Sequence, residues 1–328
     1  MARKNLILIH RHGAGYEKDF REIAEKVHAL EPGIVIFLLP AMLKKSLPER
    51  DWAYPTLTVA LSSRFKFPVR RGPVLKNQQV EKLGQQEVFR KHGIPTPPAL
   101  PFRFGMALDP ILFGEFVVLK PMDLQQTSRG DGVHLIRRRR LLGMKPEGFP
   151  PGHPIHSATQ GYLAQRFVDS GEHPSYIRVQ TFLGKAIYAW QTTLIQPRCP
   201  LDAEDGELER ATIATQGGAK TRRLVFDADV LALAERVHAA LPHIPMLGVD
   251  IIREAGTGRL FVLECNPGGN TWHISSDIGE KIRLGLGDAE TNGKEKAEEI
   301  GRRIMIDQFG AFDIVARRLA DATLKMAA

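Results

Sequence analysis

Three oxygen-bearing side chains near the end of this sequence have the types and spacing of a divalent-cation site. Glu264 and Asn266 stand two residues apart in LECNPGGN, so on a β-strand they point to one face. The apolar segment before them, LGVDIIRE, is connected by the short turn AGTG, which favours an antiparallel hairpin with Asp250 opposite the pair. Such oxygen ligands suit Mg²⁺, which shares its coordination with waters and substrate phosphates. The alternative interpretation is an edge strand with a solvated face, followed by a Pro-Gly-Gly turn.

The same alternation makes a prediction for the apolar residues of this strand. Phe261, Leu263 and Cys265 are expected together on the opposite face. Cys265 is then a small core residue rather than a nucleophile.

A lysine and a glycine-containing turn upstream have the types that bind phosphate. Lys120 ends the apolar strand FVVLK, so its aliphatic part is held while its ammonium group extends beyond the strand. The turn SRGDG follows, and its glycines allow backbone N–H groups to approach phosphate oxygens. Taken singly, a lysine at the end of a strand is commonly a solvated side chain without a ligand, and such a turn commonly connects two strands without binding phosphate. Their order along the chain is therefore the informative feature.

These residues must be positioned by a chain of two or more α/β units. The opening segments NLILIH, FREIAEKVHAL and GIVIFLLP predict a strand, a helix and a strand, hence a small parallel sheet. Its first loop, HRHGAG, is an incomplete glycine fingerprint, so a plain turn and a ligand-binding loop both remain open. A unit boundary is predicted near residue 76, ahead of a helix in NQQVEKLGQQEVFRKHG that His92-Gly93 ends.

The segments that follow predict mainly strands. FVVLKPMD and VHLIRR form a predicted hairpin, and LLGMKPEGFPPGHPIHS is a loop because it is rich in Pro and Gly. Further strands are predicted in GYLAQRFVD, SYIRVQTFLGKAIYAWQTTL, RRLVFD, MLGVDIIRE and RLFVLECN, with one helix, ADVLALAERVHAAL, between the third and the fourth. The tail from about Lys294 to Met326 is predicted as an amphipathic helix in two pieces that break near Gly310.

Composition indicates a globular protein. The chain has 328 residues, of which 43% are hydrophobic, enough for more than one core. Its longest apolar runs are far shorter than the roughly 20 residues of a membrane span, and its start lacks a small-residue cleavage site. We therefore expect neither a membrane helix nor a signal peptide. Two cysteines, Cys199 and Cys265, suit a reducing compartment, and cytoplasm is the expected location.

The chain is also basic, with a net charge of +8 and a pI of about 9.5, which favours anionic partners such as nucleotides and carboxylates. The densest run, Arg137-Arg138-Arg139-Arg140, is either a solvated end of an element or an anion-facing patch. No zinc-finger spacing or aromatic-interleaved basic motif accompanies it, so nucleic acid is not the expected partner.

Five segments in a fixed order give the chain a resemblance to the ATP-grasp superfamily. It is similar to the carboxylate-amine ligases, in the branch that includes ribosomal-protein glutamate ligases and glutathione synthetase. The segments are QVEKLGQQEVFRKHGIPTPP, VVLKPMDLQQTSRGDGVHLI, LAQRFVD, SYIRVQTFLGKAIYAW, and the pair LGVDIIRE with LECNPGGN, within roughly Asn77 to Ser276.

The resemblance implies an ATP-grasp fold of class α/β, or α+β. A small parallel N-terminal domain is expected over residues 1–76, followed by an ATP-grasp domain over 77–328. Within the latter, a lid subdomain of about 98–166 and a metal-binding lobe of about 167–328 hold ATP between antiparallel sheets.

The resemblance also implies roles for individual residues. Lysines bind the nucleotide phosphates, a glycine-rich lid loop covers them, and the hinge strand holds adenine. The ATP-binding residues are then Lys82, Lys120, Ser128, Arg129, Gly130, Gly132, Gln165, Arg166, Phe167 and Val168. The catalytic residues are Arg178 and Lys120, the metal ligands are Asp250, Glu264 and Asn266, and the substrate residues are Gly268, Gly269, Asn270 and His273.

Four positions depart from the family pattern. Arg166 and Tyr176 stand where the family usually carries acids. Thr192 stands where an arginine commonly helps to bind the acyl group, and Ile213 replaces a usual asparagine. ATP binding is therefore better supported than the ligation chemistry.

Two functions follow, and a third, weaker interpretation is a basic nucleic-acid- or ribosome-associated protein, suggested by the charge and by Arg137 to Arg140. The first is an ATP-dependent carboxylate-amine, or carboxylate-thiol, ligase that works through an acylphosphate, releases ADP, and uses Mg²⁺, with Mn²⁺ as an alternative. The second is an ATP-binding regulatory protein that has lost ligation. The carboxylate and amine substrates are not identified by any segment. The oligomeric state is open: many relatives pair as dimers, so a homodimer is one alternative.

Overall fold

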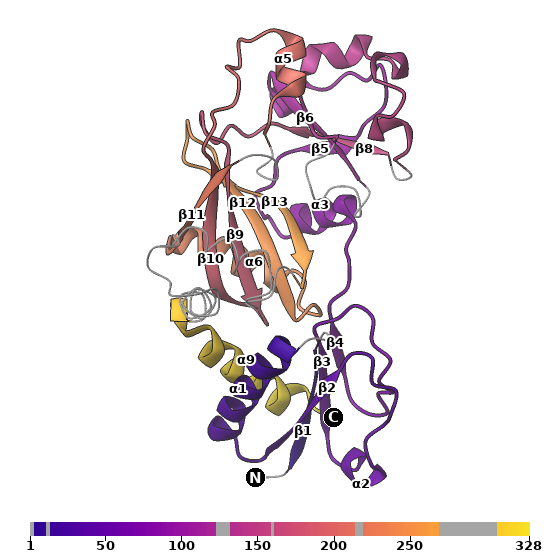
Figure 1. Ribbon diagram of the computed structural model, residues 1–328, viewed down its shortest axis with the longest axis vertical. Helices are drawn as coiled ribbons and strands as arrows, with labels where there is room; N and C mark the ends of the chain where they lie inside the picture. Colours follow the sequence, from indigo (N-terminus) through magenta and orange to yellow (C-terminus); the bar gives the residue numbers. More distant parts are fainter. Residues whose placement is uncertain (1–2, 11–13, 123–131, 159–160, 214–218, 269–306) are drawn as a thin grey trace.

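The computed structural model describes residues 3–10, 14–122, 132–158, 161–213, 219–268 and 307–328. Three sheets lie along the long axis of the molecule, and they are numbered here in chain order: the first is at one end, the second is at the other end, and the third lies between them (Figure 1). The first sheet is parallel, and the other two are antiparallel. The mixed α/β architecture predicted from the sequence is confirmed. No helix within these ranges is both long enough and apolar enough to cross a membrane.

The N-terminal sheet has its central strand covered on both faces. Leu6 and Leu8 share a core with helix α1 (Ala14–Leu30), whereas Ile7 and Ile9 share one with Trp52. Coverage of both faces explains the uninterrupted apolar run LILI. The strand order is β2 (Ile34–Pro40), β1 (Lys4–His10), β3 (Thr56–Ala60) and β4 (Val74–Lys76), with the short helix α2 (Glu49–Trp52) ahead of β3.

The C-terminal helix α9 (Ala311–Met326) returns to this N-terminal unit and lies beside α1 (Figure 1). Phe312 and Val315 enter the core that contains α1 and β1. The helix begins after Gly310, whose φ is 67°, at the predicted break, and the turn η6 (Gln308–Gly310) precedes it. The last helix therefore stabilises a unit that the sequence predicted to be complete by residue 76.

Helix α3 (Lys82–Lys91) connects the N-terminal sheet to the second sheet. It begins at Lys82 rather than near Asn77, and it ends at His92 and Gly93 as predicted, with a φ of 61° at the glycine. Phe89 is buried in the core of the third sheet, so α3 is held against that sheet.

The second sheet along the chain, here called the lid sheet, has a hydrophobic cluster on one face. Leu119 and Ala164 pack with Leu108 and Phe113 of α4 (Pro110–Phe113). The strand order is β5 (Ala99–Pro101), β8 (Tyr162–Arg166), β6 (Phe116–Pro121) and β7 (His134–Arg137). Antiparallel pairing of β6 with β7 confirms the predicted hairpin. Three short turns of helix follow β7, namely η2 (Arg138–Gly143), η3 (Pro146–Gly148) and η4 (Pro154–His156).

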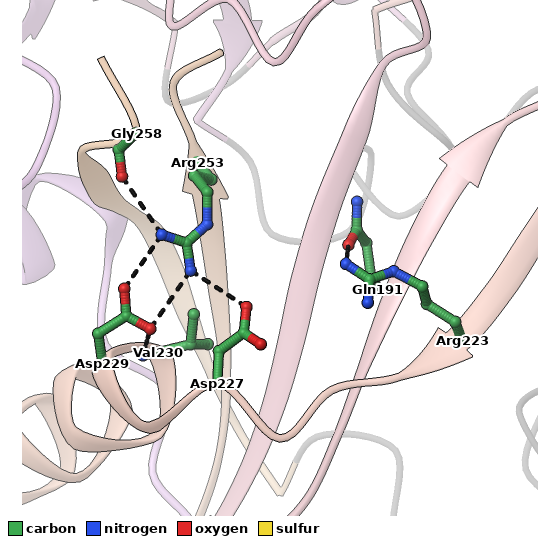
Figure 2. Close-up of polar contacts among 7 residues, drawn as sticks. All are labelled: Gln191, Arg223, Asp227, Asp229, Val230, Arg253 and Gly258. Carbon is green, nitrogen blue, oxygen red and sulfur yellow. Dashed lines mark hydrogen bonds and ion pairs between the residues drawn. The ribbon is translucent and has the colours of Figure 1, made fainter. Parts of the chain in front are cut away.

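The third sheet, here called the large sheet, carries α6 (Ala228–Ala239) on one face. Its strand order is β11 (Lys220–Leu224), β10 (Lys185–Leu194), β9 (Ser175–Phe182), β12 (Met246–Arg253) and β13 (Leu260–Pro267). Arg253 anchors the start of α6, because its Nη1 lies 3.0 Å from Asp229 Oδ2 and its Nη2 lies 3.2 Å from Asp227 Oδ2 (Figure 2). Acidic residues at a helix N-terminus are favourable because they interact with the helix dipole. Asp227 and Asp229 therefore stabilise the start of α6 and also bind Arg253.

The predicted hairpin of β12 and β13 is present, but one prediction about its faces is wrong. Asp250 is paired with Glu264, and the next residue of β12 is paired with Val262, so Leu263 is an additional residue in a bulge. Val262 and Cys265 therefore share the core beside α6, while Phe261 and Leu263 pack elsewhere. Strict alternation placed Phe261, Leu263 and Cys265 together because it assumed no bulge.

The connection between β10 and β11 crosses to the lid sheet and contains helix α5 (Asp205–Arg210), in a segment with no predicted element. Arg137 binds the carboxylate of Asp205, and Arg140 Nη1 lies 2.6 Å from Glu209 Oε1. Arg138 donates to backbone carbonyls of the lid unit. The basic run therefore mainly makes contacts within the protein, and the sequence interpretations as a solvated end or an anion patch do not describe it.

Candidate functional site

Two lysines and two carboxylates from four elements meet where the lid sheet approaches the large sheet. The ammonium group of Lys120, at the end of β6, interacts electrostatically with Glu264 and Asp250. Lys82, at the start of α3, interacts with Glu264 in the same way. Lys82 Nζ also donates to the carbonyl oxygen of Pro121, at 2.9 Å, next to Lys120. The structure thus brings Lys120 to both predicted metal-binding acids and Lys82 to Glu264.

Burial and neighbouring charge set the protonation of this group. Burial lowers the pKa of Lys120, against the opposing effect of Glu264 and Asp250. Burial by itself raises the pKa of Glu264, but the charges of Lys120, Lys82 and Arg178 and the hydrogen bond from Asn266 together leave the pKa below its usual value. Burial raises the pKa of Asp250 to about 6, although nearby cations oppose this. The neighbouring cations therefore favour the ionised form of both carboxylates.

Arg178 holds Asp250 through two hydrogen bonds. Strands β9 and β12 pair these two residues directly, and Arg178 Nη2 lies 2.7 Å from Asp250 Oδ2 while its Nε donates to Oδ1. The side chain of Arg178 passes close to Gly248, where a Cβ atom would be 2.8 Å from Arg178 Nη1. Glycine at position 248 therefore leaves room for the arginine side chain.

The third predicted metal ligand lies beside both acids. Asn266 Nδ2 is 3.2 Å from Glu264 Oε1 and 3.4 Å from Asp250 Oδ2. Among the described residues no group of three His, Cys, Asp or Glu side chains has the spacing of a metal site. Two carboxylates and an amide fit Mg²⁺, because this ion keeps several waters and needs few protein ligands.

The face of the lid sheet that carries Lys120 adds apolar and amide groups next to this lysine. Strand pairing puts Lys120 and Leu163 on the same face as Val118 and Gln165. The Nε2 atom of Gln165 is buried and has no hydrogen-bond partner within the described parts of the chain. A buried donor beside a leucine and a lysine is chemically suited to a purine base with its phosphates.

The remaining hinge residues contact protein. Arg166 Nη2 lies 2.6 Å from Glu254 Oε1, and its guanidinium carbon lies 5.4 Å from the centre of the Phe261 ring. Val168 is buried beside Phe261, and Phe167 makes an edge contact with the Phe116 ring. The hinge side chains thus join the two antiparallel sheets.

Several predicted positions fall outside the described residues, namely Ser128, Arg129, Gly130, Gly269, Asn270 and His273. Of the described glycines, Gly132 has a φ of 72°, and a Cβ atom there would lie 2.4 Å from Tyr162 Oη. The N–H of Gly268 donates to the carbonyl oxygen of Met246 at 2.8 Å, so this amide is not available to a substrate carboxylate.

Two residues of this site were not among the predictions. Gln85 lies three residues after Lys82, on the same face of α3, and it binds the strand that carries Glu264. Gly248 is a glycine inside a strand, a signal for close approach by another group. Both signals are present in the sequence.

A cavity of about 220 Å³ lies elsewhere, towards the α6 face of the large sheet. Ile177 and Gln191 are among its lining residues, and two of its charged residues, both arginines, have partners within the lining. Arg253 binds Asp227, and Arg223 Nη2 lies 2.6 Å from Gln191 Oε1 (Figure 2). Its lining includes none of the lysines or acids of the candidate site.

No family model and no curated protein matches this chain. Solved structures resemble it over most of its length. D-alanine–D-alanine ligase from Bacillus anthracis, complexed with ATP, is 12% identical with a TM-score of 0.43, and the match covers 97% of this chain and 99% of that one. D-cycloserine synthetase DcsG is 14% identical with a TM-score of 0.44, over 92% and 99% of the two chains.

The ATP-grasp ligase PsnB, complexed with a phosphomimetic variant of its minimal precursor, Mg and ADP, is 12% identical with a TM-score of 0.45, over 82% of this chain and 91% of that one. At these identities and TM-scores, the likeness by itself assigns no activity to the chain.

Proposed function

We propose that this chain is an ATP-grasp ligase that joins a carboxylate to an amine and releases ADP. One observation carries the proposal: Lys82, Lys120, Asp250 and Glu264, from four different elements, form a single charged group. Cations that bind a triphosphate and acids that bind its metal ion need this arrangement. The order of the five ATP-grasp segments in the sequence supports the same function.

The chain's own residues have separate tasks. Lys82 and Lys120 bind the phosphate oxygens, and the face of the lid sheet around Leu163 and Gln165 receives the base. Asp250, Glu264 and Asn266 hold Mg²⁺, or Mn²⁺. The bound ion offsets negative charge on the phosphates.

The mechanism depends on position and charge rather than on an acid–base pair. A carboxylate oxygen attacks the γ-phosphorus, ADP leaves, and an amine then displaces phosphate from the acylphosphate to form an amide. Arg178 keeps Asp250 ionised and oriented, and its guanidinium offers further N–H groups to the transferred phosphoryl group. These fixed charges stabilise the developing charge without reorganisation.

The substrates are a small carboxylate and an amine, and the reducing cytoplasm is the proposed location, since Cys199 and Cys265 are both free thiols. No described contact selects one carboxylate.

The test is Mg²⁺-dependent ADP release over a panel of amino acids, dipeptides and organic acids. We expect release only when a carboxylate and an amine are both present, and its loss in Glu264→Ala. Glu87→Ala, on the exposed side of α3, is the control and should retain release. Full activity in Glu264→Ala contradicts the metal assignment. ATP binding without ADP release for any pair supports the regulatory alternative instead.

A further inference from the structure

The strand that carries Glu264 and Asn266 is at the edge of the large sheet. In the strand order β11-β10-β9-β12-β13, β13 has a paired neighbour on one side only. The backbone groups on its outer side need other partners, because buried N–H and C=O groups are rarely left unpaired. The segment after α3 supplies some of them, since Val262 N donates to Pro95 O at 2.8 Å and Thr96 Oγ1 donates to Val262 O at 3.0 Å.

At the ligand-bearing end of β13, the side chain of Gln85 replaces a neighbouring strand. Its Oε1 accepts a hydrogen bond from Cys265 N at 2.8 Å, and its Nε2 donates to Cys265 O at 2.9 Å. The same Nε2 donates to Val80 O at 2.9 Å, and Gln85 is only 4% exposed. One buried amide thus satisfies both backbone groups of a single edge residue and is itself held by the start of α3.

Cys265 is the residue between Glu264 and Asn266. A rotation of its peptide groups would move the side chains of both neighbours, because the three residues share a rigid extended backbone. Cys265 is buried and packs in the core beside α6, which fixes its side chain but not its outer backbone groups. The contact with Gln85 fixes the latter.

We infer that Gln85 is a positioning residue for the cation ligands Glu264 and Asn266. Gln85 and Lys82 lie on the same face of α3, so one helix sets both a phosphate-binding cation and the strand that carries the metal ligands. The effect of Gln85 on cation binding rests on the proposed function, whereas its hydrogen bonds to the edge strand β13 do not. A leucine or methionine of similar size would fill the space but would leave Cys265 N and O without partners.

The experiment uses Gln85→Met in the full chain, with Gln86→Met as the matched control. Gln86 is the next residue of α3, and its Oε1 lies 3.0 Å from Thr96 Oγ1 and makes no hydrogen bond with Cys265 in the described part of the chain, so its replacement leaves the Cys265 contact intact. All variants carry Cys199→Ser, because the chain has two cysteines and Cys265 then becomes the single thiol.

The first measurement is the rate at which Ellman's reagent modifies Cys265 in native protein. Loss of both hydrogen bonds should raise this rate by roughly tenfold or more in Gln85→Met, since local opening of the edge becomes easier. The rate should be unchanged in Gln86→Met. Gln85→Glu keeps the acceptor for Cys265 N and loses the donor, so an intermediate rate is expected. This variant also serves if Gln85→Met does not fold.

The second measurement is the affinity for Mn²⁺ in the presence of ADP, followed by electron paramagnetic resonance. The dissociation constant should rise about 10–100-fold in Gln85→Met, as for other residues that orient metal ligands, and stay unchanged in Gln86→Met. A faster thiol reaction with unchanged Mn²⁺ affinity overturns the positioning role. An unchanged thiol rate overturns the hold on the strand. If the parent protein binds no Mn²⁺ with ADP, the proposed function fails, and the thiol rate alone decides whether Gln85 holds β13.

Discussion

Replacing Gly248 by alanine tests whether an empty position on β12 is what lets Arg178 reach Asp250. The new Cβ atom would lie 2.8 Å from Arg178 Nη1, and 3.2 Å from both Arg178 Cδ and Gln180 Oε1. Nη1 must retreat by about 0.6 Å to reach the 3.4 Å of an ordinary contact. This atom belongs to the guanidinium that holds Asp250 at 2.7 Å, so the retreat cannot occur without weakening the ion pair.

The expected cost is that of overpacking a core, about 1–3 kcal/mol. Complete loss of a partner for a buried charge costs more, about 3–5 kcal/mol, and sets the upper limit. Because Arg178 opposes the effect of burial on Asp250, its displacement should raise the pKa of Asp250 above its present value of about 6. The acidic limb of any Mg²⁺-dependent activity should then move to higher pH.

The assay is equilibrium urea denaturation followed by tryptophan fluorescence, in a double-mutant cycle with Arg178→Ala. Once the arginine is removed, Gly248→Ala should cost less by roughly 1 kcal/mol or more, because the clash has gone. Gly256→Ala is the control, since a Cβ atom there meets nothing within 4 Å, and it should change stability by less than about 0.5 kcal/mol. Wild-type stability in Gly248→Ala, or an equal cost in both backgrounds, refutes the reasoning.

Two further predictions concern other contacts. Burial lowers the pKa of His238 from 6.5 to about 4, so the unfolded chain binds the proton first, and stability that is present above pH 6.5 should fall as the pH decreases towards 4. The stability lost over this range is about 3 kcal/mol. Urea denaturation from pH 7 to pH 4.5 should show that the free energy of unfolding declines less steeply in His238→Gln than in the wild type, and that it declines as in the wild type in the exposed His28→Gln. Arg137→Ala should release α5 from the lid sheet, because Arg137 binds the Asp205 carboxylate and two nearby carbonyls. Endoproteinase Glu-C should then cut the segment from Glu204 to Glu209 several-fold faster than in Arg139→Ala. Equal rates of cleavage would show that Arg137 does not hold α5 against the lid sheet.

The sequence determined the elements of the site because its signals are local. Two apolar segments with the short turn AGTG between them predicted the hairpin of β12 and β13, and the register pairs Asp250 with Glu264 as expected. A lysine after an apolar strand predicted the position of Lys120 at the end of β6. Proline and glycine after Lys91 predicted where α3 ends.

Tertiary structure decided what lies between these elements, because such contacts join residues far apart in the chain. No local pattern marks the bulge at Leu263, which arises from the pairing of β13 with β12 and changes which apolar residues face α6. The packing of α9 on α1, and of α5 on the lid sheet, likewise depends on surfaces that form only when the sheets are assembled. The sequence by itself therefore determined which groups could bind a metal ion and phosphate. The fold decided that Arg178 holds Asp250 and that Gln85 holds β13. A hydrogen bond needs two partners at about 3 Å, and these partners are 72 and 180 residues apart in the chain.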